Sequence, residues 1–430
     1  MHTNLFRKTE PPISAIYDIN LQDPIHFNLD NGVDVWGINF GELEVAKVDL
    51  LFDAGSVFGK NPLTSGFTNL CLREGTHNYT SDQIAEIIDN YGASIRLNSG
   101  RDSAGITLVC LTKYLKALIP LLSDIVLKPT FPEKELKTLT DRYRQNFMVD
   151  MEKVKVLSDR HFGKLAFGKN HIYHRYAKLE DYDNITPTDL IEFYEMFYKN
   201  SKFQIVISGL MPENIAELLN VYFGKHLIEE NNIKPQGAYE AEPASGFHFF
   251  EKVNSLQSCI NIGKPIFNIH HPDYIGMQVL NTMLGGYFGS RLMKNIREDK
   301  GYTYGINSFF LNLKFSGLFK IVTQVGAEVT KPAIDEIINE IERIRKAPAE
   351  EQELNLVKNY MLGNLLQLSD GSFGQSELLK TMLTFQKDIS FYKKMITTIK
   401  SISKEEIQDL AVNYLDPNSM LSIVVGKKTE

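Results

Sequence analysis

The chain has 430 residues and a mass of 48.9 kDa, and at roughly 100–200 residues per domain this length predicts about two to four domains. A composition that is 43% hydrophobic and 23% charged is typical of a soluble globular protein and excludes a disordered or fibrous chain. The net charge of −7 argues against a nucleic-acid partner. No apolar run approaches the roughly 18 residues of a membrane helix.

The first 30 residues contain Pro11, Pro12 and several acidic residues, but no apolar segment of the kind that secretory signals carry. We therefore expect a cytoplasmic location, or a periplasmic one if a leader has been removed from the chain.

Strands are expected before helices in the N-terminal half. The turn Asp30-Asn31-Gly32 is typical of a β-hairpin, because Asn-Gly accepts a positive φ. Runs of strands followed by runs of helices predict an α+β fold, with helices packed on one face of a mainly antiparallel sheet. The predicted elements are strands at 26–29, 33–38, 45–52, 94–97 and 105–111, and a helix capped by Ser81 and stopped by Gly92.

The chain contains an internal repeat. A capped helix followed by an apolar strand that ends in Gly occupies residues 185–209, and the same pattern, with no gap, occupies residues 402–426. Upstream, an apolar helical stripe, a break containing Pro and the start of a long helix occur near 112–136 and again near 334–354. These repeats predict two copies of one domain, at 1–224 and 247–430, joined by a polar linker at 225–246.

Metal and nucleophile motifs are weak. The pair His171 and His174 lies beside a Gly-containing loop, so the pair is expected to be surface or loop histidines rather than ligands. Gly75 separates Glu74 from His77 and predicts a turn instead of a shared helix face, and the adjacent His270 and His271 form no motif. The three cysteines, Cys71, Cys110 and Cys259, lie in apolar stretches and are expected to be reduced core residues.

The segment 284–305 is more distinctive. Its first part, Leu284 to Ser290, is rich in Gly but follows a helix, and this predicts a tight helix–helix turn rather than a phosphate loop. A short basic helix then ends at Gly301, and a Tyr-rich strand is expected to follow. Arg297 and Tyr304 are expected to project from one corner, where a guanidinium and a phenol suit hydrogen bonds to peptide carbonyls. A solvated helix face with an ordinary strand tyrosine is the equal alternative.

At this segment the chain resembles the short, two-domain subunits of the pitrilysin or insulinase superfamily (peptidase family M16), which include subunits of the mitochondrial processing peptidase and core proteins of the respiratory bc1 complex. The resemblance covers nearly the whole chain and is most specific from Leu284 to Tyr304. It implies the pitrilysin-type fold, which is LuxS/metallohydrolase-like, and a substrate-clamping role for Arg297 and Tyr304. It also implies that Gly285 and Gly286 let a substrate or partner backbone approach closely.

The sequence departs from that family at the zinc motif. Active members carry His-x-x-Glu-His in the interval that corresponds to residues 66–76, and this interval contains no histidine before His77. Counting forward from Gly66 places Asn69, Leu72 and Arg73 at the motif positions, and counting back from Gly75 places Gly66, Asn69 and Leu70 there. The helix that supplies the third ligand offers only Gln145. No metal or cofactor is therefore expected in this chain.

The resemblance implies a non-catalytic, substrate-binding subunit of a heterodimeric zinc metallopeptidase. Its expected partners are an extended peptide and a homologous subunit that bears the zinc motif, or a second copy of the chain, with neither nucleic acid nor membrane. Two alternatives remain open, namely a scaffold protein of the same fold and an active peptidase with an unrecognised metal site.

Overall fold

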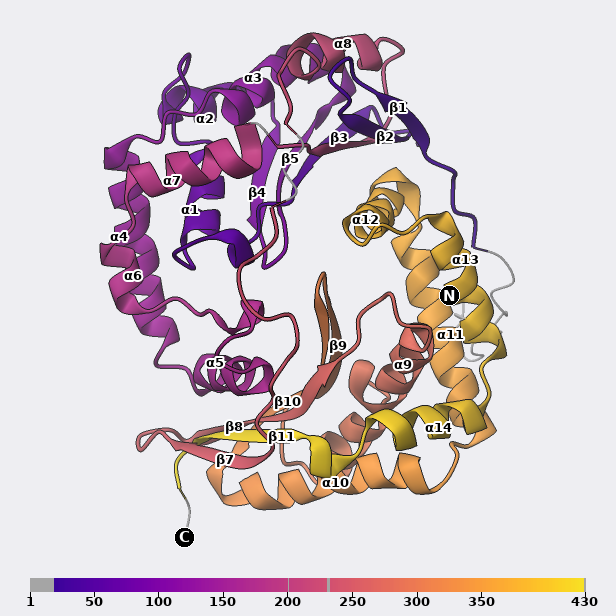
Figure 1. The fold of residues 1–430 in the computed structure, drawn as a ribbon. Coiled ribbons are helices and arrows are strands. Elements are labelled where there is room, and N and C mark those ends of the chain that lie inside the picture. Colours follow the sequence, from indigo (N-terminus) through magenta and orange to yellow (C-terminus); the bar gives the residue numbers. More distant parts are fainter. Residues whose placement is uncertain (1–18, 200, 230–232, 429–430) are drawn as a thin grey trace, which may run out of the picture.

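A computed structural model of the chain describes residues 19–199, 201–229 and 233–428. Residues 1–18, where part of the expectation about a leader falls, and residues 230–232 of the predicted linker lie outside this description. The described chain forms two β-sheets that face each other, one built from each half, with helices around both (Figure 1). None of the described helices is both long and apolar enough to cross a membrane.

The first sheet has the strand order β1-β2-β6-β3-β5-β4. All its neighbouring strands are antiparallel except β2 and β6, which are parallel. The predicted hairpin is confirmed, because β1 pairs with β2 around Gly32, whose φ is +82°. The strands are β1 (Ile25–Asn28), β2 (Asp34–Ile38), β3 (Val45–Phe52), β4 (Ser94–Ser99), β5 (Ala104–Leu111) and β6 (Gln204–Gly209).

Helices cover the outer face of this sheet, where the alternate residues Val48, Leu50 and Phe52 of β3 enter a continuous apolar core. The predicted helix at Ser81 exists, but its cap is Thr80, whose side chain accepts a hydrogen bond from the Gln83 backbone. The α-helices are α1 (Thr64–Cys71), α2 (Ser81–Asn90), α3 (Leu115–Leu127), α4 (Glu133–Asp150), α5 (Val154–Phe167), α6 (Leu179–Asp183), α7 (Pro187–Tyr194) and α8 (Ile215–Phe223).

The second sheet has the order β7-β11-β8-β10-β9 and again contains one parallel pair, β7 with β11. Among the described strands it therefore repeats the arrangement of the first sheet without a counterpart of β1. The strands are β7 (Gly246–Glu251), β8 (Gln257–Ile266), β9 (Ile306–Leu313), β10 (Ser316–Gly326) and β11 (Leu421–Gly426).

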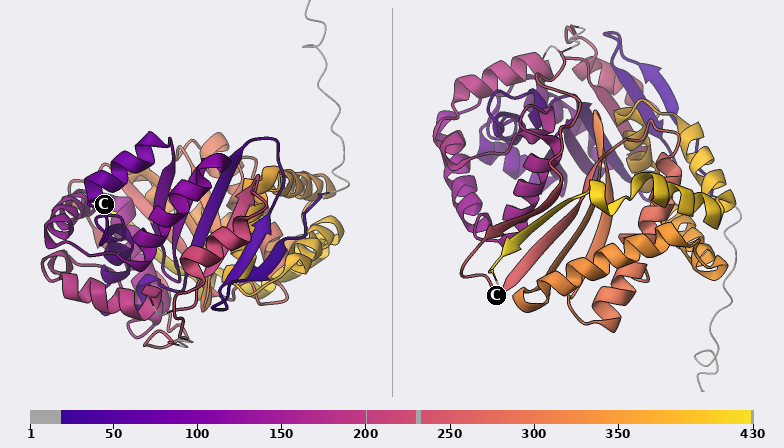
Figure 2. Two further views of the ribbon diagram at one scale, coloured as in Figure 1. Left: turned by 90° about the horizontal axis from the view of Figure 1, so that it is seen from above. Right: turned by 60° about the horizontal axis from the view of Figure 1, so that its bottom comes forward.

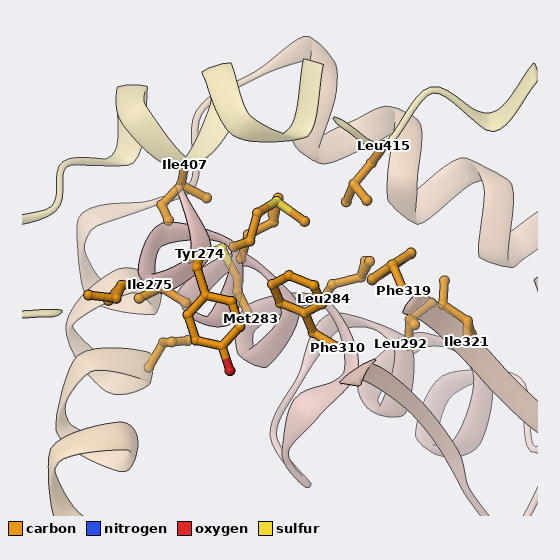
Figure 3. Close-up of a cluster of buried hydrophobic side chains, with 14 of the residues drawn as sticks. Tyr274, Ile275, Met283, Leu284, Leu292, Phe310, Phe319, Ile321, Ile407 and Leu415 are labelled. Carbon is orange, nitrogen blue, oxygen red and sulfur yellow. The ribbon is translucent and has the colours of Figure 1, made fainter. Parts of the chain in front are cut away.

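The outer face of the second sheet carries its own helices, with α10 running along it (Figure 2). Figure 3 shows part of this core, in which Tyr274, Met283 and Phe310 pack together. The helices are α9 (Tyr274–Asn281), α10 (Thr330–Lys346), α11 (Glu351–Leu368), α12 (Gly371–Thr384), α13 (Ile389–Ser401) and α14 (Lys404–Tyr414), with π-helical turns at Thr282–Gly286 and Met293–Asp299.

The internal repeat is present in the structure. Helices α7 and α14 begin at Pro187 and Lys404, and strands β6 and β11 end at Gly209 and Gly426, so the same interval separates both pairs. Both helices start with a capping box, formed by Thr186 with Asp189 and by Ser403 with Glu406. The α+β class and the duplicated, mainly antiparallel sheets predicted from the sequence are thus confirmed.

One pair of equivalent helices is exchanged between the halves. Helix α5 packs on β8 and β11 of the second sheet, and its counterpart in the repeat, α12, packs on β6 and β2 of the first (Figure 1). Each sheet is consequently covered on its inner face by a helix from the other half. Alternation along β6 shows the effect, since Ile205 faces the first core whereas Val206 belongs to the second.

Candidate functional site

Arg297 lies in the last turn of the π-helical segment Met293–Asp299, and Tyr304 lies on the connection from that segment to strand β9. The guanidinium carbon of Arg297 lies 4.4 Å from the centroid of the Phe288 ring, and Tyr304 is 94% exposed. Within the described chain, neither the Arg297 guanidinium nor the Tyr304 hydroxyl forms a hydrogen bond or an ion pair. Both groups therefore keep their donors available for a ligand.

Short contacts hold this connection in place. The Tyr302 backbone amide donates to the Ile296 carbonyl at 3.0 Å, and the Thr303 hydroxyl donates to the Gln324 carbonyl of β10 at 2.7 Å. The expectation that Tyr304 lies early in a strand is wrong, because β9 begins only at Ile306 and the tyrosine belongs to the loop before it. The predicted helix end at Gly301 is correct, with a φ of +66°.

The loop leads into an open sheet edge. Strand β9 is the last strand of the second sheet and pairs only with β10 among the described strands. Phe309 and Leu311 alternate on the face of β9 that its neighbours leave exposed. The amide of Ile306 at the start of β9 donates to the Met293 Sδ at 3.4 Å, and no described strand pairs with the outer edge of β9. An edge strand with alternating apolar side chains is a site at which an extended peptide adds as a further strand.

The Gly-rich turn before this site has a structural role. As predicted, Leu284 to Ser290 forms a tight connection between two helical segments. A Cβ added to Gly285 would lie 2.8 Å from the Ser308 backbone nitrogen of β9. Gly285 thus permits the close approach of the chain's own edge strand, in contrast to the expected approach of a partner backbone.

The position of the family's zinc motif is occupied by core packing. Phe67 on α1 is 3% exposed, and its ring lies 5.6 Å from the ring of Tyr143 on α4. Asn69 is buried and donates to the Tyr198 hydroxyl at 3.1 Å, whereas Arg73 is exposed and donates to the Ile95 carbonyl. Aromatic, amide and guanidinium groups are no ligand set for Zn²⁺, so these residues do not fit the metal.

The remaining motif positions support the same conclusion. Leu72 is completely buried, Leu70 is half-buried, and Gln145 on α4 is exposed. Among residues 19–199, 201–229 and 233–428, no group of three His, Cys, Asp or Glu side chains is arranged to hold a metal ion.

Packing and local hydrogen bonds account for the histidines and cysteines that the sequence singles out. His171 lies in a loop, as one alternative of the expectation has it, but it is buried rather than at the surface, and its Nε2 lies 3.1 Å from the Tyr239 carbonyl. Burial lowers its pKa, and burial raises the pKa of Cys71 to about 12. All three cysteines are free and buried, as predicted. Glu74 accepts from the Ser81 hydroxyl at 2.8 Å, and His77 is exposed on the turn that Gly75 predicted.

Two features between the halves have no signal in the sequence. A cavity of about 860 Å³ lies near the end of β9, where the Lys314 ammonium pairs with Asp53 at 2.9 Å. A charged cluster joins α12 to β3, in which Lys47 lies 2.7 Å from Glu377 and Lys380 lies 3.0 Å from Asp49. The partners come from opposite halves of the chain, and no local pattern marks contacts over such a separation.

Sequence models of one family match both parts of the chain. The model described as "Insulinase (Peptidase family M16)" matches residues 42–169, and the model described as "Peptidase M16 inactive domain" matches residues 184–361. Together the two matches cover most of the chain.

Several curated proteins are similar over most of their length. "Uncharacterized zinc protease YmxG" of Bacillus subtilis is 22% identical, with 84% of this chain and 87% of the relative covered. "Non-peptidase homolog YmxG" of Helicobacter pylori is 22% identical, with 92% and 96% covered. "Mitochondrial-processing peptidase subunit beta" of Caenorhabditis elegans is 22% identical, with 99% and 95% covered. Relatives therefore include a protein named as a non-peptidase and one named as a subunit.

A solved structure shows the same fold. The crystal structure of a "peptidase M16 inactive domain" from Pseudomonas fluorescens superimposes with a TM-score of 0.85 at 22% identity, with 95% of this chain and 99% of that chain covered. At this identity the likeness bears on the fold alone.

Proposed function

Because this chain belongs to peptidase family M16, the insulinase family, we propose that it is a member without peptidase activity of its own. In this proposal it binds an extended peptide for a homologous, zinc-bearing partner. The observation that carries the proposal is a combination of two features. The buried residues of the zinc-motif interval, Asn69 and Leu72, offer no zinc ligands, and the hydrogen-bond donors of Arg297 and Tyr304 have no partner within the described residues beside an open sheet edge.

The lack of catalysis follows from the donor set. An M16 enzyme needs two histidines and a glutamate as ligands and a further glutamate as the base that activates water. The corresponding stretch, which is α1 with its C-cap, supplies Asn69 and Leu72 instead, and both are buried in the core of the first half. Relatives described as non-peptidase proteins support this part of the proposal.

Peptide binding follows from the open edge and the two free donors. A peptide added to β9 would place its carbonyls within the reach of donors at the start of that strand, where Tyr304 is solvent-exposed. The exposed rings of Phe288 and Phe309 offer apolar contacts for alternate side chains of the peptide. The partner is proposed because relatives include a peptidase subunit and because the described residues contain no group of ligands arranged to hold a metal ion.

Metal analysis of the purified chain tests the first part. After dialysis against zinc, we expect much less than one zinc per chain and no chelator-sensitive cleavage of labelled β-casein, an unfolded polypeptide. Stoichiometric zinc together with such cleavage by the chain alone would overturn the proposal and favour an active peptidase.

Titration with the same labelled β-casein tests the clamp. Arg297→Ala and Tyr304→Phe should each weaken binding by about 1–3 kcal/mol if their hydrogen bonds to the peptide are buried. Tyr222→Phe is the matched control, because Tyr222 is an exposed tyrosine on α8 and its change should leave binding unaltered. Unchanged binding by a double variant of Arg297 and Tyr304 would refute their assignment.

A further inference from the structure

The segment that carries Arg297 has an uncommon helical form. Residues Met293–Asp299 form a π-helical turn, and the Lys300 amide that closes it donates to the Asn295 carbonyl, five residues back, at 3.0 Å. Such turns are wider than those of an α-helix, are rare, and are frequent at functional sites. Because their geometry differs from that of an α-helix, the direction of the Arg297 side chain depends on the contacts that keep this turn in its form.

Asn295 attaches the turn to helix α10. Its side-chain amide uses both hydrogens, since Nδ2 donates to Glu340 Oε1 at 2.7 Å and to Glu336 Oε2 at 3.0 Å. The two glutamates are four residues apart and therefore lie on one face of α10. On the inner side of the segment, Leu292 and Ile296 are buried in the core of the second half, where Figure 3 shows Leu292.

The carboxylate of Glu340 is buried at a cost. Its side chain is 1% exposed, and Oε2 has no hydrogen-bond partner among the described residues. The Arg343 guanidinium also donates to Oε1 at 2.8 Å, but the Arg343 side chain is 70% exposed. A buried carboxylate with a second one at i,i+4 destabilises a helix contact that apolar residues would form at least as well. The pair is therefore explained by the group that it holds, the Asn295 amide.

The start of the same helical segment is also fixed. Arg291, four residues before Asn295, forms a bidentate ion pair with Glu353 of α11, in which both N···O distances are 2.7 Å. Its side chain is 15% exposed, and the bidentate geometry fixes the orientation of the guanidinium. Arg291 and Asn295 thus attach the segment to α11 and α10, whereas Arg297 has no hydrogen bond or ion pair within the part of the chain that the structure describes.

We propose that Asn295, held by Glu340 and Glu336, is a positioning residue for Arg297. It keeps the π-helical turn in its form and thereby sets the direction in which the Arg297 guanidinium meets the peptide. This inference rests on the proposed peptide binding by Arg297. Asn295 itself does not contact the peptide, and its whole effect on binding passes through Arg297.

A double-mutant cycle on the binding of labelled β-casein by the full chain tests the proposal. Asn295→Ala removes both donors and should weaken binding roughly fivefold, because Arg297 loses its fixed direction. In a chain that already carries Arg297→Ala, the same change should weaken binding less than about twofold, since no guanidinium remains to be positioned. Hydrogen exchange is a second measurement, in which the Lys300 amide should exchange at least about tenfold faster in Asn295→Ala.

Two further variants separate positioning from a general loss of structure, with circular dichroism as the check on folding. Asn355→Ala is the matched control, because Asn355 Nδ2 donates to Glu351 Oε1 at 3.5 Å in an exposed contact on α11. It should change neither binding nor exchange. Glu336→Ala keeps the bond from Asn295 to Glu340 and should show both effects of Asn295→Ala to a smaller degree. It replaces Asn295→Ala in the cycle if that variant does not fold.

The outcomes distinguish this inference from the proposed function. If the unaltered chain does not bind labelled β-casein, the proposed function fails and the inference fails with it. If the unaltered chain binds and Asn295→Ala leaves binding and exchange unchanged, the inference alone is overturned. An equal loss of binding with and without the Arg297 side chain would also overturn it, because Asn295 would then act through another contact.

Discussion

Asp49 provides a measurable test of how the two halves are held together. This carboxylate on β3 is 1% exposed and faces α12 of the other half, where it accepts from the Lys380 ammonium at 3.0 Å. It also accepts from the Thr107 hydroxyl at 2.5 Å and lies 3.6 Å from the Lys47 ammonium. The substitution Asp49→Asn keeps the size of the side chain and removes its charge.

The loss of stability expected for Asp49→Asn depends on which charges of the cluster remain. Removing one partner of a buried ion pair costs about 3–5 kcal/mol, because the other charge is left uncompensated. Here Glu377 stays 2.7 Å from Lys47 and 2.8 Å from Lys380, so we expect the lower end of that range, about 3 kcal/mol. With an unfolding entropy of about 2.1 cal/mol/K per residue, that cost lowers the Tm of a chain of this length by about 3 °C.

Thermal and urea unfolding followed by circular dichroism measure this change. Glu377→Gln is the control, because the Glu377 side chain is 55% exposed and its removal should cost only about 1 kcal/mol. Combining Asp49→Asn with Lys380→Met should restore part of the loss, since the second change removes one of the uncompensated ammonium groups. A Tm within about 1 °C of the unaltered protein for Asp49→Asn would refute this account of the interface.

Three further outcomes are expected. Phe67→Ala should lower the free energy of unfolding by about 3–5 kcal/mol in urea titrations, because it leaves a cavity at a buried aromatic contact. Burial opposes the ionisation of Glu377, but its hydrogen bonds to two lysines outweigh burial and lower its pKa below 4.5. The stability lost in Glu377→Gln should therefore be constant above pH 4.5 and shrink as the pH falls below it, measured by unfolding across that range. Cys71 should resist a thiol reagent until the chain unfolds, because its thiol is buried.

Local patterns were sufficient for much of the fold. Asn31-Gly32 identified the β1–β2 hairpin, and the alternation in residues 45–52 identified β3 with its observed bounds. The repeat of the pattern at 185–209 in residues 402–426 identified the duplication, because each copy has its own cap, helix and strand. Short local patterns failed at boundaries, such as the cap at Thr80 and the start of β9 after Tyr304, where adjacent residues offer equal local choices.

The features of the candidate site also fall into those that the sequence predicts and those that depend on tertiary structure. The absence of His-x-x-Glu-His and the presence of Arg297 and Tyr304 are properties of the sequence, and they directed attention to a non-catalytic subunit. That Phe67, within the zinc-motif interval, packs against Tyr143, and that Gly285 accommodates β9, depends on residues from elements distant in the chain.

The sequence by itself determined the two-copy α+β architecture and the loss of zinc ligands, because hydrophobic periodicity and residue identity are local properties. Tertiary structure decided that α5 and α12 exchange between the halves and that Asp49 and Lys380 meet across them. It also decided that, within the part of the chain that the structure describes, no strand covers β7 as β1 covers β2. These features depend on which surfaces meet when the two copies fold against each other. Because the two copies are nearly equivalent, local sequence does not decide which copy a helix packs against. Contacts between residues far apart in the chain decide it.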